Sequence, residues 1–432
     1  MEIIGNYNKD CVIYNDNINE DELTMIYSLL NNKEMENSKI RIMPDQHLGN
    51  GCLIGFTSTI TDSVNPQFVG VDIGCSITTC ITDTKINTEE LPLIEHRIKK
   101  EIPLGMSIND KKVFNEKDFY KFVNKELNKA CSSWPEMIYN ISFDENYVTN
   151  MLKRINMDEG VFYKSLCSLG GGNHFIEVGD INGNYAFTVH CGSRNLGVKV
   201  CKYWEKVASS AQIDNKLFKN QVDELKKKVK DKRTLPTLIK ELKESFALKN
   251  SNNGYLKGDN LKGYITDMVI AQSYAKYNHL LICNKISDIF RKINNGKVIE
   301  TIQSTHNYID ITGDHILRKG SIRAYKDEKI IIPFNMRDGL AICVGKSNED
   351  WNCSAPHGAG RKLSRSKAKQ SLTMEEFTNE MKDIYSTSVC ESTIDESPMA
   401  YKDTNEIIKF IQETCDIICF VKPIINIKST NG

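Results

Sequence analysis

The sequence predicts a protein of mixed α/β (α+β) class. We expect a single large domain in which mixed sheets are flanked by helices. Two observations lead to this prediction. Short apolar strands and charged, amphipathic helical segments follow one another along the chain. No linker, internal repeat or low-complexity tract divides the 432 residues, and the residues with chemical character are spread from position 45 to position 428. We therefore expect one domain over residues 1–432, with a charged helical hairpin at residues 202–250 within it.

The composition argues against a secreted protein, a membrane protein and a protein that binds nucleic acid through overall positive charge. Hydrophobic residues make up 40% of the chain, and 56 lysines and arginines balance 56 aspartates and glutamates. Because there is no overall basic field, a nucleic-acid partner would have to be bound by a local patch. The 14 cysteines include no CxxC pair, the start MEIIGNYNKD has no secretory character, and no apolar run approaches the length of a membrane span. We expect reduced, mostly buried thiols and a cytoplasmic protein that contacts no membrane.

The first sixty residues predict a strand, a helix and a loop between two further strands. The short strand is Val12–Tyr14, and the helix lies near residues 20–30 with Asp21 as its N-cap. The segment IRIMPDQHLGNGCLIGFTSTI, residues 40–60, then places Asp45 and several glycines between two apolar runs. A polar, Gly-rich loop between strands is either a tight connection or a ligand loop, and the residues favour neither.

An acid and a thiol stand three residues apart in FVGVDIGCSITT, where Asp72 and Cys75 share one turn with two glycines. If the chain turns between them, both side chains can converge on one ion, and a thiolate can bridge two metals. The alternative is a buried strand that carries a small cysteine, which is the more common environment of this residue.

Two histidines belong to the glycine-rich segment SLGGGNHFIEVGDINGNYAFTVHCGSR. Three glycines precede His174, alternating residues then predict a strand, and Asn182–Gly183 predicts a hairpin turn. The second strand of the hairpin ends at His190. Imidazole binds borderline metals and glycine lets the main chain approach an anion, so the hairpin fits a phosphate-handling metal site. The alternative is that both histidines are ordinary core or turn residues.

The middle of the chain predicts helices. Residues 84–165 are charged and helical, and residues 202–250 form two amphipathic segments interrupted by Pro236, which we interpret as a solvated hairpin. Residues 259–284 have the apolar spacing of a core helix, in which His279 is interpreted as structural.

Two further histidines lie in the last third of the chain. His306 precedes an apolar pair, and two apolar strands follow around a turn at Pro333–Gly339. His357 is followed by Gly-Ala-Gly-Arg and a basic helical segment, so we place it at a helix start, where anions bind well. A helix to about Cys415 and a strand CFVKPIINIK complete the chain.

Eight short motifs resemble the RtcB family of RNA-splicing ligases, in the order typical of that family. They are MPDQHLGNG, VGVDIGC, GGGNHFIEV, HCGSRNLG, THN, SAPHGAGR, SPMAYKD and a final IK. The resemblance implies an enzyme that joins RNA 3′-phosphate or 2′,3′-cyclic phosphate ends to 5′-hydroxyl ends, using GTP and two Mn²⁺ ions in a central cleft. It also implies RNA repair or tRNA splicing in the cytoplasm by a monomer, with an archease-type activator as a candidate partner.

The resemblance further implies the role of each site residue. His357 would be the nucleophile that becomes guanylylated, and Cys75 would bridge the two Mn²⁺ ions. Asp72 and His174 would complete one metal site, and His190 and His306 the other. The GTP or GMP contacts implied in the same way are Asn173, His174, Phe175, Ile176, Glu177, His306, Asn307, Pro333, Phe334, Asn335, Met336, Gly358, Ala359, Gly360, Tyr401 and Lys428.

One segment departs from the family pattern. Many members have a PGSMG-type loop where this chain reads PFNMR, residues 333–337. Backbone contacts to the nucleotide survive this change, whereas a serine contact does not. The predicted donors, one carboxylate, one thiolate and three imidazoles, also suit Zn²⁺ or Co²⁺, so naming Mn²⁺ rests on the resemblance.

Two rival readings remain open at this point. A metal-dependent phosphoesterase or nuclease would use the same metal ligands but would have no use for a nucleophilic His357. A non-catalytic protein that binds RNA ends would need neither the ligands nor the nucleophile intact.

Overall fold

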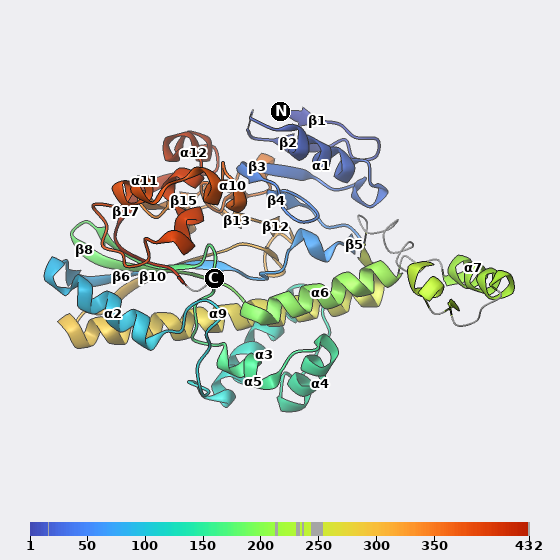
Figure 1. The fold of residues 1–432 in the computed structure, drawn as a ribbon, viewed down its shortest axis with the longest axis horizontal. Coiled ribbons are helices and arrows are strands. Elements are labelled where there is room, and N and C mark those ends of the chain that lie inside the picture. Colours follow the sequence, from blue (N-terminus) through green and yellow to red (C-terminus); the bar gives the residue numbers. More distant parts are fainter. Residues whose placement is uncertain (16, 212–214, 230–233, 236, 243–253, 431–432) are drawn as a thin grey trace.

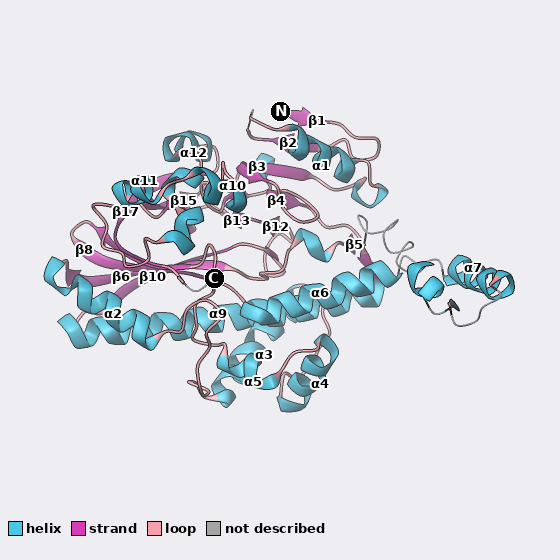
Figure 2. Cartoon of the chain, viewed as in Figure 1, coloured by secondary structure: helices cyan, strands magenta, loops and turns pink. Residues whose placement is uncertain are grey.

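A computed structural model describes residues 1–15, 17–211, 215–229, 234–235, 237–242 and 254–430. Within these residues, two large sheets lie above a layer of helices (Figures 1 and 2). The prediction of mixed sheets flanked by helices is confirmed.

The larger sheet has seven strands, all antiparallel, in the order β10-β6-β8-β7-β17-β15-β14. Neighbouring antiparallel strands alternate in direction, so one edge of the sheet collects the end of one strand and the start of the next. The strands are β6 Ser76–Lys85, β7 Phe175–Ile181, β8 Asn184–Cys191, β10 Val298–Thr305, β14 Lys329–Asn335, β15 Gly339–Gly345 and β17 Cys415–Ile427.

The second sheet has six strands in the order β1-β2-β3-β4-β12-β11, and two strand pairs, β13 with β16 and β5 with β9, stand apart. These short strands are β1 Glu2–Ile3, β2 Cys11–Ile13, β3 Ile40–His47, β4 Ile54–Ser58, β5 Ser63–Val64, β9 Leu256–Lys257, β11 Tyr308–Ile309, β12 Leu317–Lys319, β13 Ser321–Arg323 and β16 Ser354–Pro356.

A single long helix, α9 Gly258–Asn294, runs under the seven-stranded sheet, with α6 Arg194–Ala211 packed along part of its length (Figure 1). Its apolar residues are buried on nearly every side, which confirms the predicted core helix, and the observed helix is longer by one residue at its start and ten at its end. The other α-helices are α1 Glu20–Leu30, α2 Leu91–Glu101, α3 Glu116–Ser133, α4 Glu145–Ile155, α5 Glu159–Lys164, α7 Asn215–Lys228, α10 Arg365–Ser371, α11 Met374–Glu380 and α12 Thr404–Ile411.

Short 3-10 helices connect several of these elements. They are η1 Lys33–Met35, η2 Pro66–Phe68, η3 Thr88–Glu90, η4 Glu349–Trp351, η5 Glu391–Glu396 and η6 Pro398–Ala400. No helix in the described part of the chain is both long enough and apolar enough to cross a membrane.

The hairpin predicted at Asn182–Gly183 is confirmed. Both residues adopt positive φ, 53° and 81°, between β7 and β8. The predicted N-cap of α1 was wrong: Asn19, not Asp21, accepts from the Glu22 backbone N–H, and the Glu22 carboxylate accepts in return from the Asn19 N–H. A closed capping box stabilises this start better than Asp21 does from inside the first turn.

The charged hairpin predicted at residues 202–250 is only partly described. The end of α6 and helix α7 fall within it, and in Figure 1 α7 lies away from the body of the molecule. Pro236, the predicted break, and residues 243–253 lie outside the described residues.

Candidate metal and nucleotide site

Four of the predicted metal ligands stand at one edge of the seven-stranded sheet. His306 follows β10, Cys75 precedes β6, His190 is near the end of β8, and His174 precedes β7. These strands are four consecutive neighbours in the sheet, and their antiparallel order brings the four ends together. The Cys75 carbonyl accepts from the His306 N–H at 2.8 Å, which ties two of the ligands together through the backbone.

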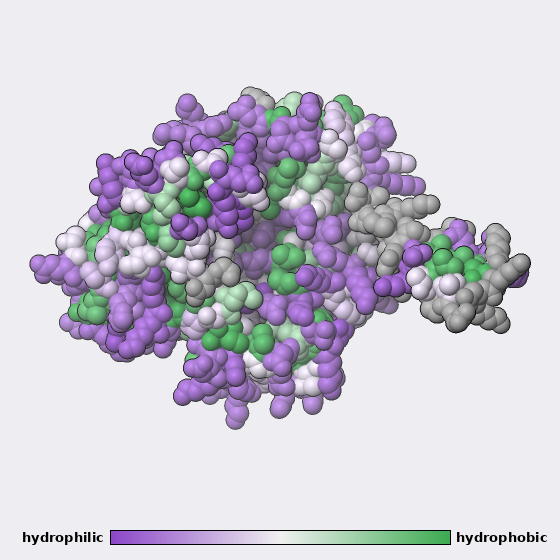
Figure 3. All heavy atoms as spheres, viewed as in Figure 1, coloured by the Kyte–Doolittle hydropathy of each residue, from purple (hydrophilic) through white to green (hydrophobic). Residues whose placement is uncertain are grey.

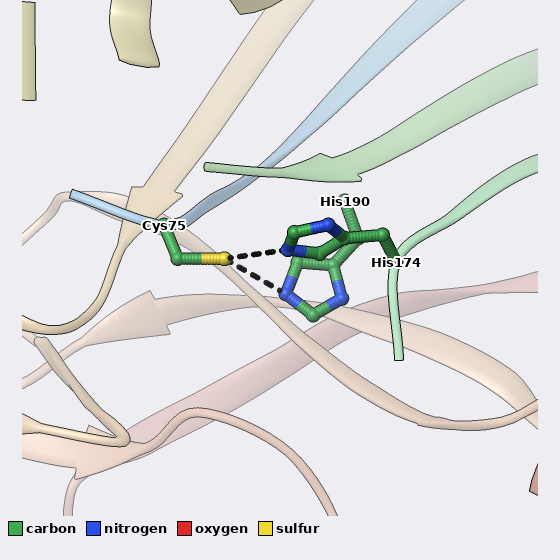
Figure 4. A group of neighbouring side chains, drawn as sticks. All are labelled: Cys75, His174 and His190. Carbon is green, nitrogen blue, oxygen red and sulfur yellow. Dashed lines mark hydrogen bonds between the residues drawn. The ribbon is translucent and has the colours of Figure 1, made fainter. Parts of the chain in front are cut away.

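The side chains of this cluster form a continuous row, in which each one contacts the next. Cys75 Sγ lies 3.5 Å from His174 Nε2 and 3.3 Å from His190 Nε2 (Figure 4). His174 Nε2 also lies 2.9 Å from Asp72 Oδ2, and His190 Nε2 lies 3.4 Å from His306 Nε2. The structure therefore brings together all five residues predicted as metal ligands.

The cluster is buried, and burial changes its protonation. Burial lowers the pKa of His190 and of His306 well below the usual range, so both imidazoles are neutral and keep a lone pair. Burial, together with the charge of Asp72, raises the pKa of the Cys75 thiol. Burial is the largest single influence on Asp72 and opposes its ionisation, but the hydrogen bond and charge of His174, together with the hydrogen bond from Cys75, outweigh burial and lower the pKa of that carboxyl.

The donor atoms fit a divalent cation. Ligand atoms of Cys75, His174 and His190 lie within 4.8 Å of one another. Among the described residues, the buried Nδ1 atoms of His174 and His306 have no hydrogen-bond partner. The atoms that converge are Cys75 Sγ and the Nε2 atoms of the three histidines, and their contacts are to one another and to Asp72. Lone-pair atoms that converge in a buried place can be stabilised together by a cation. The group can therefore bind a metal.

Main-chain contacts orient the imidazoles and the carboxylate. His190 Nδ1 lies 3.2 Å from the Asn173 carbonyl oxygen, which fixes the Nδ1–H tautomer and directs the Nε2 lone pair to the cluster. Asp72 Oδ1 accepts from the Ser193 N–H, and the Asn307 amide donates to the Asp72 carbonyl. Asn307 Oδ1 accepts from the Gly320 N–H, so its amide braces the Asp72 turn.

His357 follows strand β16, outside the seven-stranded sheet, and its ring lies against the cluster. Its ring centroid is 4.9 Å from that of His306, and its Nδ1 lies 2.8 Å from Asp45 Oδ2. The Asp45 side chain is fully buried, while that of His357 keeps 18% of its exposure. A carboxylate on Nδ1 places the ring proton there, which leaves the lone pair on Nε2.

The prediction that His357 starts a helix was wrong. It follows strand β16, Ser354–Pro356, and the next helix, α10, begins only at Arg365. The small residues after His357 do not start a helix but allow close packing, because a side chain on Gly360 would overlap the Asp45 main chain. These residues let β16 approach β3 closely enough for the His357–Asp45 contact.

A cavity of about 520 Å³ opens beside His357 and His190. Figure 3 shows this face of the molecule hollowed near its middle. The predicted site residues that line the cavity are Asn173, Phe175, Glu177, His190, Pro333, Phe334, Asn335, Met336, His357, Gly358, Ala359, Gly360, Tyr401 and Lys428.

Other predicted nucleotide contacts stand back from the cavity. The Ile176 side chain packs into the core on the opposite face of β7, because side chains alternate along a strand. Asn307 uses its amide within the Asp72 turn, and His174 and His306 belong to the cluster beneath. The PFNMR segment does line the cavity, but there Asn335 bonds to Asp338 and the backbone after it, and most of Phe334 is buried.

A buried ion cluster forms the wall of the cavity beside β17. Glu396 Oε2 accepts from Lys428 Nζ at 2.9 Å and from the Tyr401 hydroxyl at 2.7 Å. Its other oxygen lies 3.3 Å from Arg361 Nη1 and 2.5 Å from Arg365 Nη1. Although burial raises the pKa of the Glu396 carboxyl, the nearby Lys428 and Arg365 outweigh it and lower the pKa to about 2. This cluster fixes Tyr401 and Lys428, two predicted nucleotide contacts.

Asp45 and Glu396 were not predicted as functional residues. Asp45 lies in the MPDQHLGNG segment, for which the sequence favoured neither a connection nor a ligand loop, and its partner is 312 positions away. Glu396 immediately precedes the SPMAYKD motif. A carboxylate next to each motif was the available signal, but the contact itself is set by the tertiary fold.

His279 behaves as predicted, since it lies outside the cluster and is satisfied by structural contacts. Its Nδ1 lies 2.9 Å from Thr78 Oγ1 and its Nε2 lies 2.7 Å from the Cys191 carbonyl oxygen. It therefore joins α9 to β6 and β8 beneath the site.

Comparison with known proteins gives a consistent result. Residues 30–429 match the family model described as tRNA-splicing ligase RtcB. The chain is 28% identical over 409 residues to the RNA-splicing ligase RtcB of Escherichia coli K12, which covers 90% of each chain. It is 24% identical to the tRNA-splicing ligase RtcB of Nanoarchaeum equitans, covering 90% of this chain and 87% of the relative. It is 25% identical to an RNA-splicing ligase RtcB homolog of Entamoeba dispar, covering 89% and 80%.

Proposed function

Because the chain belongs to the RtcB family of RNA-splicing ligases, we propose that it joins RNA 3′-phosphate or 2′,3′-cyclic phosphate ends to 5′-hydroxyl ends with GTP and Mn²⁺. The observation that carries this proposal is the position of His357. Its Nδ1 contacts a buried carboxylate, and its ring lies next to a cluster of metal-binding donors. A metal-dependent phosphoesterase would need the cluster but not an oriented imidazole beside it.

The first step is attack of His357 on GTP. Asp45 keeps the proton on Nδ1, so the Nε2 lone pair attacks the α-phosphorus and a P–N bond forms as pyrophosphate leaves. The product is a histidine–GMP phosphoramidate. Asp45 also stabilises the positive charge that develops on the ring during attack.

In the two later steps phosphoryl groups are transferred, and the protein forms no new covalent bond. An oxygen of the RNA 3′-phosphate attacks the bound GMP, the P–N bond breaks, and His357 recovers its lone pair. The 5′-hydroxyl then attacks the activated 3′-phosphate, loses its proton, and GMP leaves as the new phosphodiester forms. Positioning and charge neutralisation dominate such steps.

The metal ligands would be Asp72, Cys75, His174, His190 and His306, among which Cys75 contacts both His174 and His190. When bound, divalent cations neutralise the phosphoryl oxygens and assist the attacking and leaving groups. Mn²⁺ is proposed from the family, because the donor set alone also suits Zn²⁺ and Co²⁺. The nucleotide contacts would come from the cavity wall, chiefly Glu177, Tyr401 and Lys428.

Labelling with α-³²P-GTP and Mn²⁺ tests the proposal. We expect a covalent label on the native protein, no label on His357→Ala, and full label on the matched control His96→Ala, whose side chain is exposed on α2. Metal-dependent RNA cleavage without any label would favour the phosphoesterase. RNA binding with neither label nor cleavage would favour the end-binding protein.

The biological setting is proposed on the same basis. Family membership supports RNA repair or tRNA splicing in the cytoplasm, by a monomer that an archease-type protein could activate. Light scattering after gel filtration tests the monomer, and the labelling assay with and without such a protein tests the activator.

A further inference from the structure

Two buried oxygen atoms in the cavity wall have no hydrogen-bond partner within the part of the chain that the structure describes. They are Glu177 Oε1 and Asn426 Oδ1, and both residues line the cavity. Each side chain is almost fully buried, with relative exposures of 2% and 1%. A buried acceptor without a donor is costly in a native fold, so two such acceptors in one cavity wall indicate a ligand that supplies donors.

Strand pairing sets the two side chains next to each other. Asn426 and Glu177 are direct partners in the antiparallel ladder between β17 and β7, so they share one face of the sheet. Backbone bonds fix the Asn426 position, because its carbonyl accepts from Ser386 Oγ at 2.6 Å and its N–H reaches the Tyr385 carbonyl. The pair is therefore rigid before any ligand enters.

The contact between the two residues decides which oxygens stay available. Asn426 Nδ2 donates to Glu177 Oε2 at 3.1 Å, which occupies one of the two carboxylate oxygens. A free carboxylate could accept two neighbouring N–H groups of a base by itself. Here one of those positions is taken, so a pair of N–H groups has to be shared between Glu177 Oε1 and Asn426 Oδ1.

We propose that Glu177 and Asn426 read the base of the nucleotide together, and that Asn426 Oδ1 accepts from the exocyclic amino group of guanine. This inference rests on the proposed function and adds a specificity-determining residue to it. Guanine presents adjacent N–H donors at N1 and at its 2-amino group, which match two adjacent acceptors when Glu177 is ionised. Burial without a ligand raises the pKa of this carboxyl, and N–H donors from a bound base would favour its ionised form. Hypoxanthine keeps only the N1 donor, and adenine presents an acceptor at N1 that would face the carboxylate.

Inosine triphosphate isolates the contact, because it differs from GTP only by the 2-amino group. With Mn²⁺ present, kcat/KM for adduct formation on His357 is measured by mass spectrometry of the intact protein with each nucleotide. We expect GTP to be preferred by roughly 10- to 100-fold, since ITP leaves Asn426 Oδ1 buried and unpaired. Equal use of GTP and ITP would overturn the inference.

The variant Asn426→Leu assigns the preference to this residue. Leucine has a similar volume but no acceptor. Although it frees Glu177 Oε2, that oxygen belongs to β7 and does not take the position of Asn426 Oδ1 on β17, so we expect the ratio of the GTP rate to the ITP rate to fall several-fold toward one. A ratio as large as that of the native protein would contradict the assignment. The matched control is Lys422→Leu, an exposed position on the same strand, which should keep the native ratio.

The outcomes separate this inference from the proposed function. If neither nucleotide forms an adduct, the ligase proposal fails and this inference with it. If both form adducts equally well, only the inference fails. The comparison of GTP with ITP on the native protein decides the matter even if Asn426→Leu does not fold, which a melting curve would show.

Discussion

Two clusters of polar side chains meet at one cavity and are built on opposite principles. In the first, Cys75, His174, His190 and His306 bring lone-pair donors within contact of one another, and few hydrogen bonds satisfy them. In the second, Glu396 accepts from Lys428, Tyr401 and two arginines, so its charge is compensated. The Asn173 carbonyl oxygen touches both, at 3.2 Å from His190 Nδ1 and 3.4 Å from Lys428 Nζ.

The difference shows how one cavity can serve two kinds of ligand. The histidine and cysteine cluster offers several lone pairs in one place, so a bound cation would stabilise it. The Glu396 cluster is complete without a ligand and fixes Lys428 and Tyr401 in place beforehand, which lowers the cost of ordering them when an anion binds. Substitutions in the histidine and cysteine cluster and in the Glu396 cluster should therefore have different effects.

The largest effect is expected for Cys75→Ala. Without the thiolate that touches both His174 and His190, Mn²⁺ binding should weaken strongly and ligation should fall by at least about 10³-fold, because bound metal contributes several kcal/mol of charge stabilisation. Calorimetric titration with Mn²⁺ and a ligation assay measure the two effects. The control Cys80→Ala, on the same strand β6 but outside the cluster, should keep both, and a fully active Cys75→Ala protein would contradict a thiolate at the metal.

The next effect concerns stability. Glu396→Gln leaves Lys428 and Arg361 buried without a counter-charge, so the unfolding free energy should fall by about 3 kcal/mol. Urea denaturation followed by circular dichroism measures this loss. Glu391→Gln, an exposed position in the same 3-10 helix, is the control and should change the midpoint little. An unchanged midpoint for Glu396→Gln would show that this wall is not preorganised by charge.

A smaller effect on activity is expected for Asp45→Asn, which changes the residue that contacts His357. Asp45→Asn keeps the size of the side chain but not its charge, so the favoured tautomer and the stabilisation of the reacting ring are weakened. We expect kcat for guanylylation to fall about 100-fold while KM for GTP stays the same. The exposed variant Asp62→Asn should behave like the native protein. A rise in KM at constant kcat would place Asp45 in nucleotide binding instead.

The last expected effect is a dependence of stability on pH. Burial raises the pKa of Glu177 from 4.5 to about 8. Between these values the folded protein binds a proton that the unfolded chain has lost, so the unfolding free energy falls as pH rises from about 4.5 to about 8, by up to about 1.4 kcal/mol per pH unit. Urea midpoints across this range measure the slope, and Glu177→Gln should reduce it. An equal slope in that variant would assign the effect to other groups.

Local sequence signals predicted the parts of the fold that local physics controls. Asn182–Gly183 adopts the positive φ values that its residue types favour, and the apolar spacing of residues 259–284 found the core helix. The capping residue of α1 was mistaken because Asn19 and Asp21 are both good N-caps, and only the reciprocal contact with Glu22 separates them. The family resemblance then supplied what spacing could not, the set of five donors that meet at one sheet edge.

The missed residues share one cause. Asp45 and Glu396 act through contacts with His357 and Lys428 that depend on how β3, β16 and β17 are arranged, and nothing in the residues near each of them reveals that arrangement. Asn426 is a similar case, since the strand pattern predicts β17 but not that it pairs with β7 at Glu177. The helix start expected at His357 failed for the related reason that small residues also permit close strand approach.

The position of β17 has a consequence for a chain that lacks its C-terminal residues. This strand comes after all the other described strands in the sequence, yet it lies inside the sheet, between β7 and β15. Those two strands are therefore joined into one sheet only through residues 415–427. A polypeptide that ends before β17 would contain Cys75, His174, His190 and His306 but would lack Asn426 and Lys428, which line the cavity.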